Sequence, residues 1–336
     1  MTALSGLAQN YTHLLLARIG VGIGEAGGSP PAHAMISDYY PAHQRGTAMA
    51  VYSTGVHLGI LLGFIVGGVV SQYFGWRVAF FSVGIPGVLF AVVFFLTVKE
   101  PPRGRWEGTV EQVHKPTLAE TMKTLSGFRS FWYLALATGL SAFAGYGSGN
   151  FAPSFLMRNH GFSVGEVGLI LAFVGGFAGM IGTFLGGFIA DRLGHTERRW
   201  YLWVPAISGL VAIPLSFPYL LLDNTAVVLG VSFFLSIAMN TYLGPALAIS
   251  HGIVPPAMRA QTSAILFFVL NLIGLGLGPL TAGLLSDWYQ PRFGEDSLRY
   301  AMLTVALLSS PSILLYFLAA RRLPTDLAKG QEMSRR

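Results

Sequence analysis

The sequence has no cysteine and few charged residues, and both absences narrow the classes of protein that it can encode. Without cysteine the chain can form no disulfide bond, which excludes a disulfide-stabilised scaffold. Asp, Glu, Lys and Arg make up only 11% of the 336 residues, about half the usual share of a soluble domain. The start of the chain also lacks the basic stretch that opens a cleavable signal peptide. The composition therefore argues against a soluble or secreted protein.

Hydrophobic residues account for 53% of the chain and gather in long runs. Nine segments are each long and apolar enough to cross a bilayer, because about 20 apolar residues span the ~30 Å hydrocarbon core. A single segment can do so only as a helix, which satisfies its own backbone hydrogen bonds. The sequence therefore predicts an all-α, multi-pass membrane protein. The predicted spans are residues 12–37, 47–71, 76–98, 131–157, 167–190, 201–222, 225–250, 261–286 and 299–319.

Basic residues are distributed unevenly between the two alternating sets of connections. One set, which includes the loop 99–130 and the tail 321–336, holds 16 of the 21 Lys and Arg residues, and the other set holds four. Cytoplasmic loops carry the excess of basic residues. We therefore predict an integral protein of the cell or plasma membrane with a cytoplasmic C-terminus. The net charge of +6 then needs no nucleic-acid partner.

A weak internal repeat relates the two halves of the chain. Arg45 and Arg259 each follow a proline by four residues, and they stand 214 residues apart. The glycine-bounded runs Gly63–Gly68 and Gly278–Gly283 match at an offset of 215, which implies one inserted residue. Two bundles related by such a repeat are common in secondary transporters.

One loop carries a recognisable motif. The segment Gly187-Phe-Ile-Ala-Asp191-Arg192-Leu-Gly194 resembles the G-x-L-x-D-R-x-G motif of the major facilitator superfamily. The resemblance implies two six-helix bundles that alternate between inward-open and outward-open states. It also implies that Asp191 caps the N-terminus of the eleventh helix, where a carboxylate stabilises the positive end of the helix dipole. The alternative is a plain turn whose charges only set topology. The predicted gating positions are Gly187, Asp191, Arg192, Gly194 and the repeated Arg45 and Arg259.

Two further segments are similar to one subgroup of that family, the Spinster-like transporters. The run Arg18-Ile-Gly-Val-Gly-Ile-Gly-Glu25-Ala26 resembles their fourth-helix pattern R-x-x-x-G-x-G-E-A. The ending Lys99-Glu-Pro-Pro-Arg103-Gly of the sixth helix resembles theirs as well. The resemblance implies amphiphilic substrates such as lysophospholipids or sphingoid lipids.

The resemblance also implies a division of the chain. Residues 131–320 would form the complete C-terminal six-helix bundle, and residues 1–98 a remnant of the N-terminal bundle with part of helix three and helices four to six. Applied backwards, the 214-residue offset places the counterparts of two spans before Met1. About the first two and a half helices would then be missing. The loop 99–130 would separate the bundles, and 321–336 would be a cytoplasmic tail.

Glu25 is an acidic residue near the middle of the first predicted span, and Arg18 precedes it by two helical turns. A charge at such depth costs on the order of 3 kcal/mol. Their axial separation of about 10.5 Å is too long for a direct ion pair on one helix. Glu25 is therefore predicted to exchange protons and Arg18 to bind substrate. The alternative is that each forms an ion pair with another helix.

Other polar residues within the predicted spans are candidates for a substrate cavity, although each could instead make an interhelical hydrogen bond worth about 1 kcal/mol. A run of three glycines near Tyr146 further suggests a broken helix, a feature that often lines substrate sites. The candidates are His57, Tyr146, Asn150, Asn240, Tyr242 and Asn271.

The function predicted from the sequence is secondary active transport of a small organic or amphiphilic solute by alternating access, coupled to protons. The protein would act as a monomer in the lipid bilayer, without a cofactor. No predicted span carries His or carboxylate pairs at metal-binding spacing or a complete nucleophile–base pair, so an enzyme is not expected. The alternatives are a non-transporting receptor or scaffold of the same fold and an inactive fragment.

Overall fold

A computed structural model describes residues 1–335 except 27, 29–31, 33–34, 37 and 102–115. Every regular element within these residues is a helix, which confirms the predicted all-α fold. The chain divides into two compact units. Unit 1 contains Met1–Val113 and Ser163–Gly176, and unit 2 contains His114–Phe162 and Phe177–Arg336. The division falls inside the loop predicted to separate the bundles, although part of the predicted span 167–190 is grouped with unit 1.

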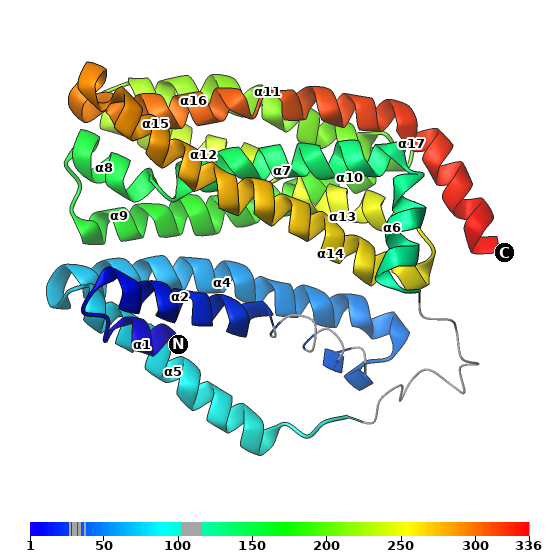
Figure 1. Ribbon diagram of the computed structural model, residues 1–336, viewed down its shortest axis with the longest axis horizontal. Coiled ribbons are helices and arrows are strands. Elements are labelled where there is room, and N and C mark those ends of the chain that lie inside the picture. Colours follow the sequence, from blue (N-terminus) through cyan, green and yellow to red (C-terminus); the bar gives the residue numbers. More distant parts are fainter. Residues whose placement is uncertain (27, 29–31, 33–34, 37, 102–115, 336) are drawn as a thin grey trace. The chain divides into compact units, whose positions relative to one another are not determined.

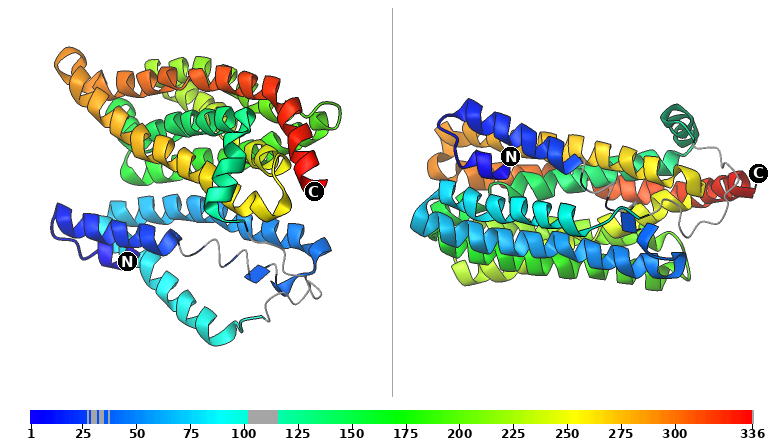
Figure 2. Two further views of the ribbon diagram at one scale, coloured as in Figure 1. Left: turned by 45° about the vertical axis from the view of Figure 1, so that its right-hand side comes forward. Right: turned by 90° about the horizontal axis from the view of Figure 1, so that it is seen from below.

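Among the described residues, unit 1 contains four helices from the start of the chain and one from its middle (Figure 1). Gly75 ends α4 and begins α5 with a φ of 83°, a conformation that favours glycine. Figure 2 shows α5 diverging from α4 after this turn. Gly68 of α4 meets Gly168 of α9 so closely that a Cβ atom on Gly68 would lie 2.7 Å from the Gly168 Cα atom. The helices are α1 (Thr2–Ser5), α2 (Tyr11–Ala26), α4 (Ala42–Phe74), α5 (Trp76–Thr97) and α9 (Val164–Leu171).

Unit 2 is a bundle of long helices, several of which are interrupted. The first group is α6 (Leu118–Ser126), α7 (Arg129–Gly149), α8 (Ala152–His160), α10 (Gly179–Gly194), α11 (Trp200–Leu221), α12 (Thr225–Met239) and α13 (Leu243–Gly252). The second group is η2 (Pro256–Met258), α14 (Arg259–Leu270), the π-helix η3 (Asn271–Leu277), α15 (Gly278–Phe293), η4 (Gly294–Asp296), α16 (Ser297–Leu308) and α17 (Pro311–Arg335). A second π-helix, η1 (Ala172–Ala178), joins α9 to α10.

Five helical stretches of the described chain are long and apolar enough to cross a membrane. They are Trp76–Thr97, Val164–Gly194, Trp200–Leu221, Thr225–Gly252 and Pro256–Met333, the last of which contains several helices. Two predicted spans, 76–98 and 201–222, match these stretches to within one residue. Four more lie inside the other three stretches: 167–190, 225–250, 261–286 and 299–319. The remaining three also correspond to helices. The span 47–71 lies within α4, the span 131–157 covers α7 and most of α8, and the described start of 12–37 is α2.

The structure differs from the predicted loop and tail. Residues 102–115 of the loop 99–130 lie outside the described part, but Leu118–Ser126 form helix α6, which begins with a capping box between Thr117 and Glu120. The predicted tail 321–336 is helical through Arg335, as the continuation of α17. Its side chains Leu323 and Asp326 are buried in unit 2, so this segment is part of the bundle.

The core of unit 2 gathers where α6, the beginning of α7 and the end of α17 meet. Close van der Waals packing between helices stabilises a bundle in the membrane, and here the packed side chains come from five or more helices. They include Leu125, Phe131, Leu202, Ile253, Tyr316 and Leu323. This anchoring fixes one end of α7, the helix that carries the predicted cavity residue Tyr146 and is followed directly by Asn150.

Candidate functional site

Arg18 and Glu25 both lie on α2 in unit 1, and both side chains are exposed. Neither has a hydrogen-bond or ion-pair partner among the residues that the structure describes. The prediction that they do not pair with each other agrees with this geometry, and their roles in transport stay predictions. Charged groups that no neighbouring side chain neutralises remain able to bind a ligand or a proton.

Two other predicted residues, His57 and Arg45, lie on α4. Their side chains fall outside the part of the structure that is described, so their predicted roles stay predictions.

The glycine run around Tyr146 lies at the end of α7, and the helix breaks just beyond it, at Asn150 and Phe151. Gly147 is the close-approach position, because a Cβ atom there would lie 3.1 Å from the Gly278 carbonyl oxygen. The Asn150 amide donates to the Tyr146 carbonyl oxygen at 3.0 Å. Asn150 thus satisfies a backbone group at the end of its own helix, and the exposed Tyr146 side chain is the freer of the two.

Asn240 and Tyr242 lie at the interruption between α12 and α13, which divides the predicted span 225–250. The Asn240 amide donates to the Ser236 carbonyl oxygen at 2.8 Å, and the Thr241 hydroxyl donates to the Ala238 carbonyl oxygen at 3.1 Å. These side chains replace the backbone donors that the break removes. Gly186 of α10 packs directly on the break, since a Cβ atom there would lie 2.1 Å from the Thr241 carbonyl oxygen.

A small cavity of about 40 Å³ lies beside this interruption. Hydroxyl groups are prominent in its wall, and Ser141 on α7 also lies 3.3 Å from the buried Tyr316 hydroxyl on α17. The volume suits about one water molecule, so the cavity alone cannot hold an organic substrate. The polar lining residues are Ser141, Thr241, Tyr242, Ser309 and Ser312. Tyr242 therefore lines this cavity together with Ser141, and Ser141 connects the cavity to the buried Tyr316 hydroxyl. The sequence analysis missed Ser141 and Tyr316.

Asn271 begins the π-helix η3, and its side chain is exposed. Single π-turns within α-helices are frequent at functional sites. η3 packs against α7, where a Cβ atom on Gly274 would lie 2.6 Å from that of Ala142. Asn271 is not among the residues that line the small cavity.

The gating motif adopts a specific local arrangement in unit 2. The Tyr201 hydroxyl donates to Asp191 Oδ1 at 2.7 Å, and Gly194 leaves room for the Tyr201 ring. Among the described contacts, Asp191 makes no hydrogen bond with α14, the predicted eleventh helix, so its capping role there stays a prediction. The Arg192 side chain is exposed, and a Cβ atom on Gly187 would meet no other atom within 4 Å.

Arg259, the other repeated arginine of the predicted gating set, lies at the beginning of α14. Its Nε atom donates to the His251 carbonyl oxygen at 3.3 Å, which joins α14 to the end of α13. The His251 ring in turn lies 2.6 Å from the Ser263 hydroxyl. Tyr201 and His251 are the partners that the sequence analysis missed, and no periodicity in the sequence singles them out.

The described residues contain no group of three His, Cys, Asp or Glu side chains arranged to hold a metal ion. The candidate residues are instead charged side chains on α2 in unit 1 and, separately, hydroxyl-bearing side chains near helix interruptions in unit 2. Polar residues on apolar helices are typical of multi-pass membrane proteins that carry a solute pathway.

The chain belongs to the Major Facilitator Superfamily, whose family model matches residues 1–274 and 134–335. It is 33% identical to an MFS-type efflux pump of Mycolicibacterium smegmatis (strain ATCC 700084 / mc(2)155), an alignment that covers 97% of this chain and 75% of that protein. These findings confirm the predicted family and fold, and they identify the protein as a membrane transporter.

Solved structures agree. A bacterial homolog to the human lysosomal transporter Spinster, in an inward-facing and unoccupied conformation, is 30% identical with a TM-score of 0.87. The match covers 97% of this chain and 81% of that one, which supports the predicted Spinster-like resemblance. A D-xylose-proton symporter is 19% identical with a TM-score of 0.67 over 92% of this chain and 77% of its own, and it shows the shared fold alone.

Proposed function

We propose that the protein is a proton-coupled secondary transporter of amphiphilic organic anions, in which Glu25 exchanges the proton and Arg18 binds the anionic head group. The observation that carries the proposal is that α2 presents both charges without a partner among the described residues. A helix that must lie in an apolar membrane would not retain two unneutralised charges unless a cavity, a ligand or a proton balanced them.

The chemistry of the two side chains suits these roles, proton exchange by Glu25 and anion binding by Arg18. Arginine keeps its charge at all physiological pH values and binds carboxylate or phosphate groups through two parallel hydrogen bonds. A carboxylate, unlike a guanidinium group, can take up a proton and become neutral, which is the property that proton relays in membrane proteins use. The relatives, an efflux pump and a homolog of a lysosomal transporter, support transport as the activity, and the substrate class rests on the chemistry of Arg18.

Alternating access requires that helices change shape or position while the bundle stays intact. The interruption between α12 and α13 and the π-helix η3 both lie in unit 2 near predicted cavity residues. We propose that Asn240, Tyr242 and Asn271 line the pathway at these interruptions, and that Asp191 and Arg259 belong to the gate. The predicted C-terminal bundle 131–320 would then move relative to residues 1–98 during transport.

The proposal is tested in proteoliposomes that contain the purified chain and trapped pyranine, a pH indicator. The probes are an NBD-labelled lysophosphatidylglycerol, which is an amphiphilic anion, and ethidium, which is a lipophilic cation. The chain is expected to move the anionic probe with an accompanying proton flux. Glu25→Gln should abolish uptake driven by a pH gradient while exchange of the probe without a gradient persists. Glu295→Gln, a change at an exposed carboxylate in η4, is the matched control.

Arg18 is tested by the same assay. Arg18→Gln should raise the KM for the anionic probe by at least about tenfold, which corresponds to about 1.4 kcal/mol, whereas Arg292→Gln at an exposed position should leave it unchanged. Full gradient-driven uptake by Glu25→Gln would refute proton coupling through this residue. Binding of the probe without uptake by the unmodified chain would instead favour a non-transporting receptor.

A further inference from the structure

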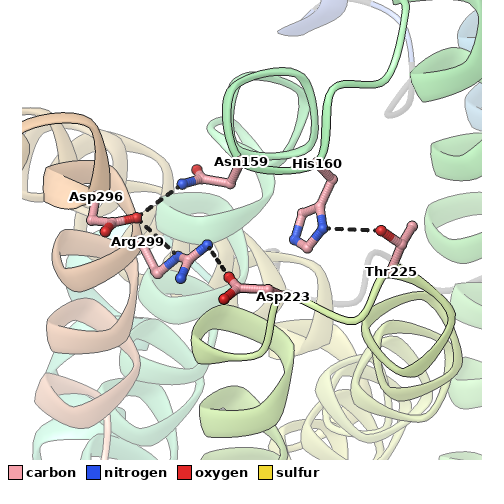
Figure 3. Close-up of polar contacts among 6 residues, drawn as sticks. All are labelled: Asn159, His160, Asp223, Thr225, Asp296 and Arg299. Carbon is pink, nitrogen blue, oxygen red and sulfur yellow. Dashed lines mark hydrogen bonds and ion pairs between the residues drawn. The ribbon is translucent and has the colours of Figure 1, made fainter.

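Three connections of unit 2 lie at the end of the bundle away from the C-terminus (Figure 1). Polar side chains join these connections to one another (Figure 3). The connections are the end of α8, the connection between α11 and α12, and the turn η4 with the start of α16. The six side chains, which we call the loop cluster, are Asn159, His160, Asp223, Thr225, Asp296 and Arg299.

Arg299 is the centre of the loop cluster. Its side chain is only 11% exposed, and its Nη2 atom lies 3.1 Å from Asp223 Oδ1. Its Nε atom lies 3.4 Å from Asp296 Oδ1, which also accepts a hydrogen bond from the Asn159 amide at 3.2 Å. A largely buried guanidinium group is stable only when it is paired. Here two carboxylates, from different connections, form ion pairs with it.

His160 ends α8, where Gly161 adopts a φ of 71° and turns the chain. Its Nδ1 atom lies 3.4 Å from the Thr225 hydroxyl oxygen, and its ring meets the Phe155 ring edge-on at 5.2 Å. Its Nε2 atom is buried and has no hydrogen-bond partner among the described residues. Figure 3 shows the imidazole beside the pair formed by Arg299 and Asp223.

Burial and the nearby Arg299 charge hold the pKa of His160 below its ordinary value of 6.5, and Asp223 opposes them. The other charged groups on the surrounding elements are Arg158 on α8 and Asp296 and Glu295 in η4. His160 is therefore neutral at neutral pH. A buried ring nitrogen without a partner then remains as a proton acceptor next to a carboxylate.

We infer that His160 is a proton-binding site, and that its protonation transfers Asp223 from Arg299 to the imidazolium. The added proton makes Nε2 a charged donor, which attracts Asp223 and repels Arg299. Arg299 keeps Asp296 as its second carboxylate. The Asp223 side chain is 86% exposed, so it can change partner without disturbing the core. At neutral pH Asp223 thus links the connection between α11 and α12 to α16. In acid Asp223 instead adds a second link from this connection to α8, beside the contact between Thr225 and His160.

The direction of the pH effect follows from linkage. Because the native pKa of His160 lies below 6.5, the unfolded chain binds more protons as the pH falls through 6.5, so the native arrangement loses stability in acid. The arrangement with Asp223 beside the imidazolium binds the proton more tightly, and acid therefore favours it over the neutral one. The inference concerns a site other than Glu25 and does not depend on which solute is transported.

The test is a double-mutant cycle on the purified full chain in detergent, measured as the melting temperature at about pH 5 and about pH 8. At the higher pH, Asp223→Asn should lower the melting temperature equally in the unmodified and His160→Gln backgrounds, because only the contact with Arg299 is lost. At the lower pH, Asp223→Asn should lower the melting temperature more in the unmodified background than in the His160→Gln background. His160→Asn serves as a second variant if His160→Gln does not fold.

The control is His195→Gln, a change at an exposed histidine in the turn after α10. Asp223→Asn should have the same effect in this background as in the unmodified chain at both pH values. The inference is overturned if Asp223→Asn has equal effects in the unmodified and His160→Gln backgrounds at about pH 5. It is also overturned if the difference between the two backgrounds is as large at about pH 8 as it is at about pH 5. Because the readout is stability, these outcomes are independent of the transport assays on Glu25 and Arg18.

Discussion

Asp326 holds the beginning of α7 from a position 196 residues further along the chain. Its side chain is 4% exposed, and Oδ2 accepts a hydrogen bond from the Ser130 backbone N–H at 2.8 Å. The N-cap residue of α7 is Phe128, which cannot cap the helix with its own side chain. The carboxylate therefore serves as the missing cap, and we predict that Asp326→Ala destabilises unit 2 more than any exposed charge on α17.

The magnitude follows from the contact that is removed. A hydrogen bond to a charged group contributes about 1.5–3 kcal/mol, and a carboxylate at a helix N-terminus adds about 0.3–1 kcal/mol through the helix dipole. Asp326→Ala also leaves a buried N–H group without a partner. We expect a loss of about 2–4 kcal/mol in the free energy of unfolding. Asp326→Asn keeps an acceptor oxygen and should lose about half of that.

The assay combines stability with a local probe. Unfolding of the purified chain by SDS in mixed micelles, followed by tryptophan fluorescence, measures the free energy. Hydrogen exchange by mass spectrometry measures protection of the Ser130 amide. The control, Glu332→Ala on the same helix, changes an exposed carboxylate and should alter stability by no more than about 0.5 kcal/mol. The reasoning is refuted if Asp326→Ala and Glu332→Ala have equal effects and exchange at the start of α7 does not change.

Two further predictions concern α10. Gly186→Ala should destabilise the bundle by about 1–3 kcal/mol, because the new Cβ atom would lie 2.1 Å from the Thr241 carbonyl oxygen. Gly187→Ala has open space around its new Cβ atom and should be tolerated. Similar unfolding curves for the two variants would contradict this prediction. Tyr201→Phe removes the donor to Asp191, and it should increase maleimide labelling of a cysteine introduced in the turn that follows α10. The chain has no other cysteine, so only the introduced one is labelled. Equal labelling of this cysteine with and without Tyr201→Phe would show that the contact does not hold the turn.

Much of the fold could be predicted because membrane spans depend on local sequence. A run of apolar residues is sufficient to predict a helix in lipid, so the helices α5 and α11 begin and end within a residue of their predicted spans. The break after Asn240 was not predicted, because the side chains that satisfy it also occur in continuous helices. The helical segment after residue 320 looked like a tail, because its charged residues hide a face that is buried only when α6 and α7 are present.

The sequence by itself determined the membrane class, the family and the charges on α2, because composition, hydrophobic length and short motifs are properties of neighbouring residues. Only the tertiary structure decided which polar groups meet. Tyr201 with Asp191, Asp326 with Ser130, and the side chains of the loop cluster are pairs whose geometry depends on how separate helices pack. Hydrogen bonds and ion pairs act only over a few ångströms, so their partners are fixed by the fold and cannot be read from either residue alone.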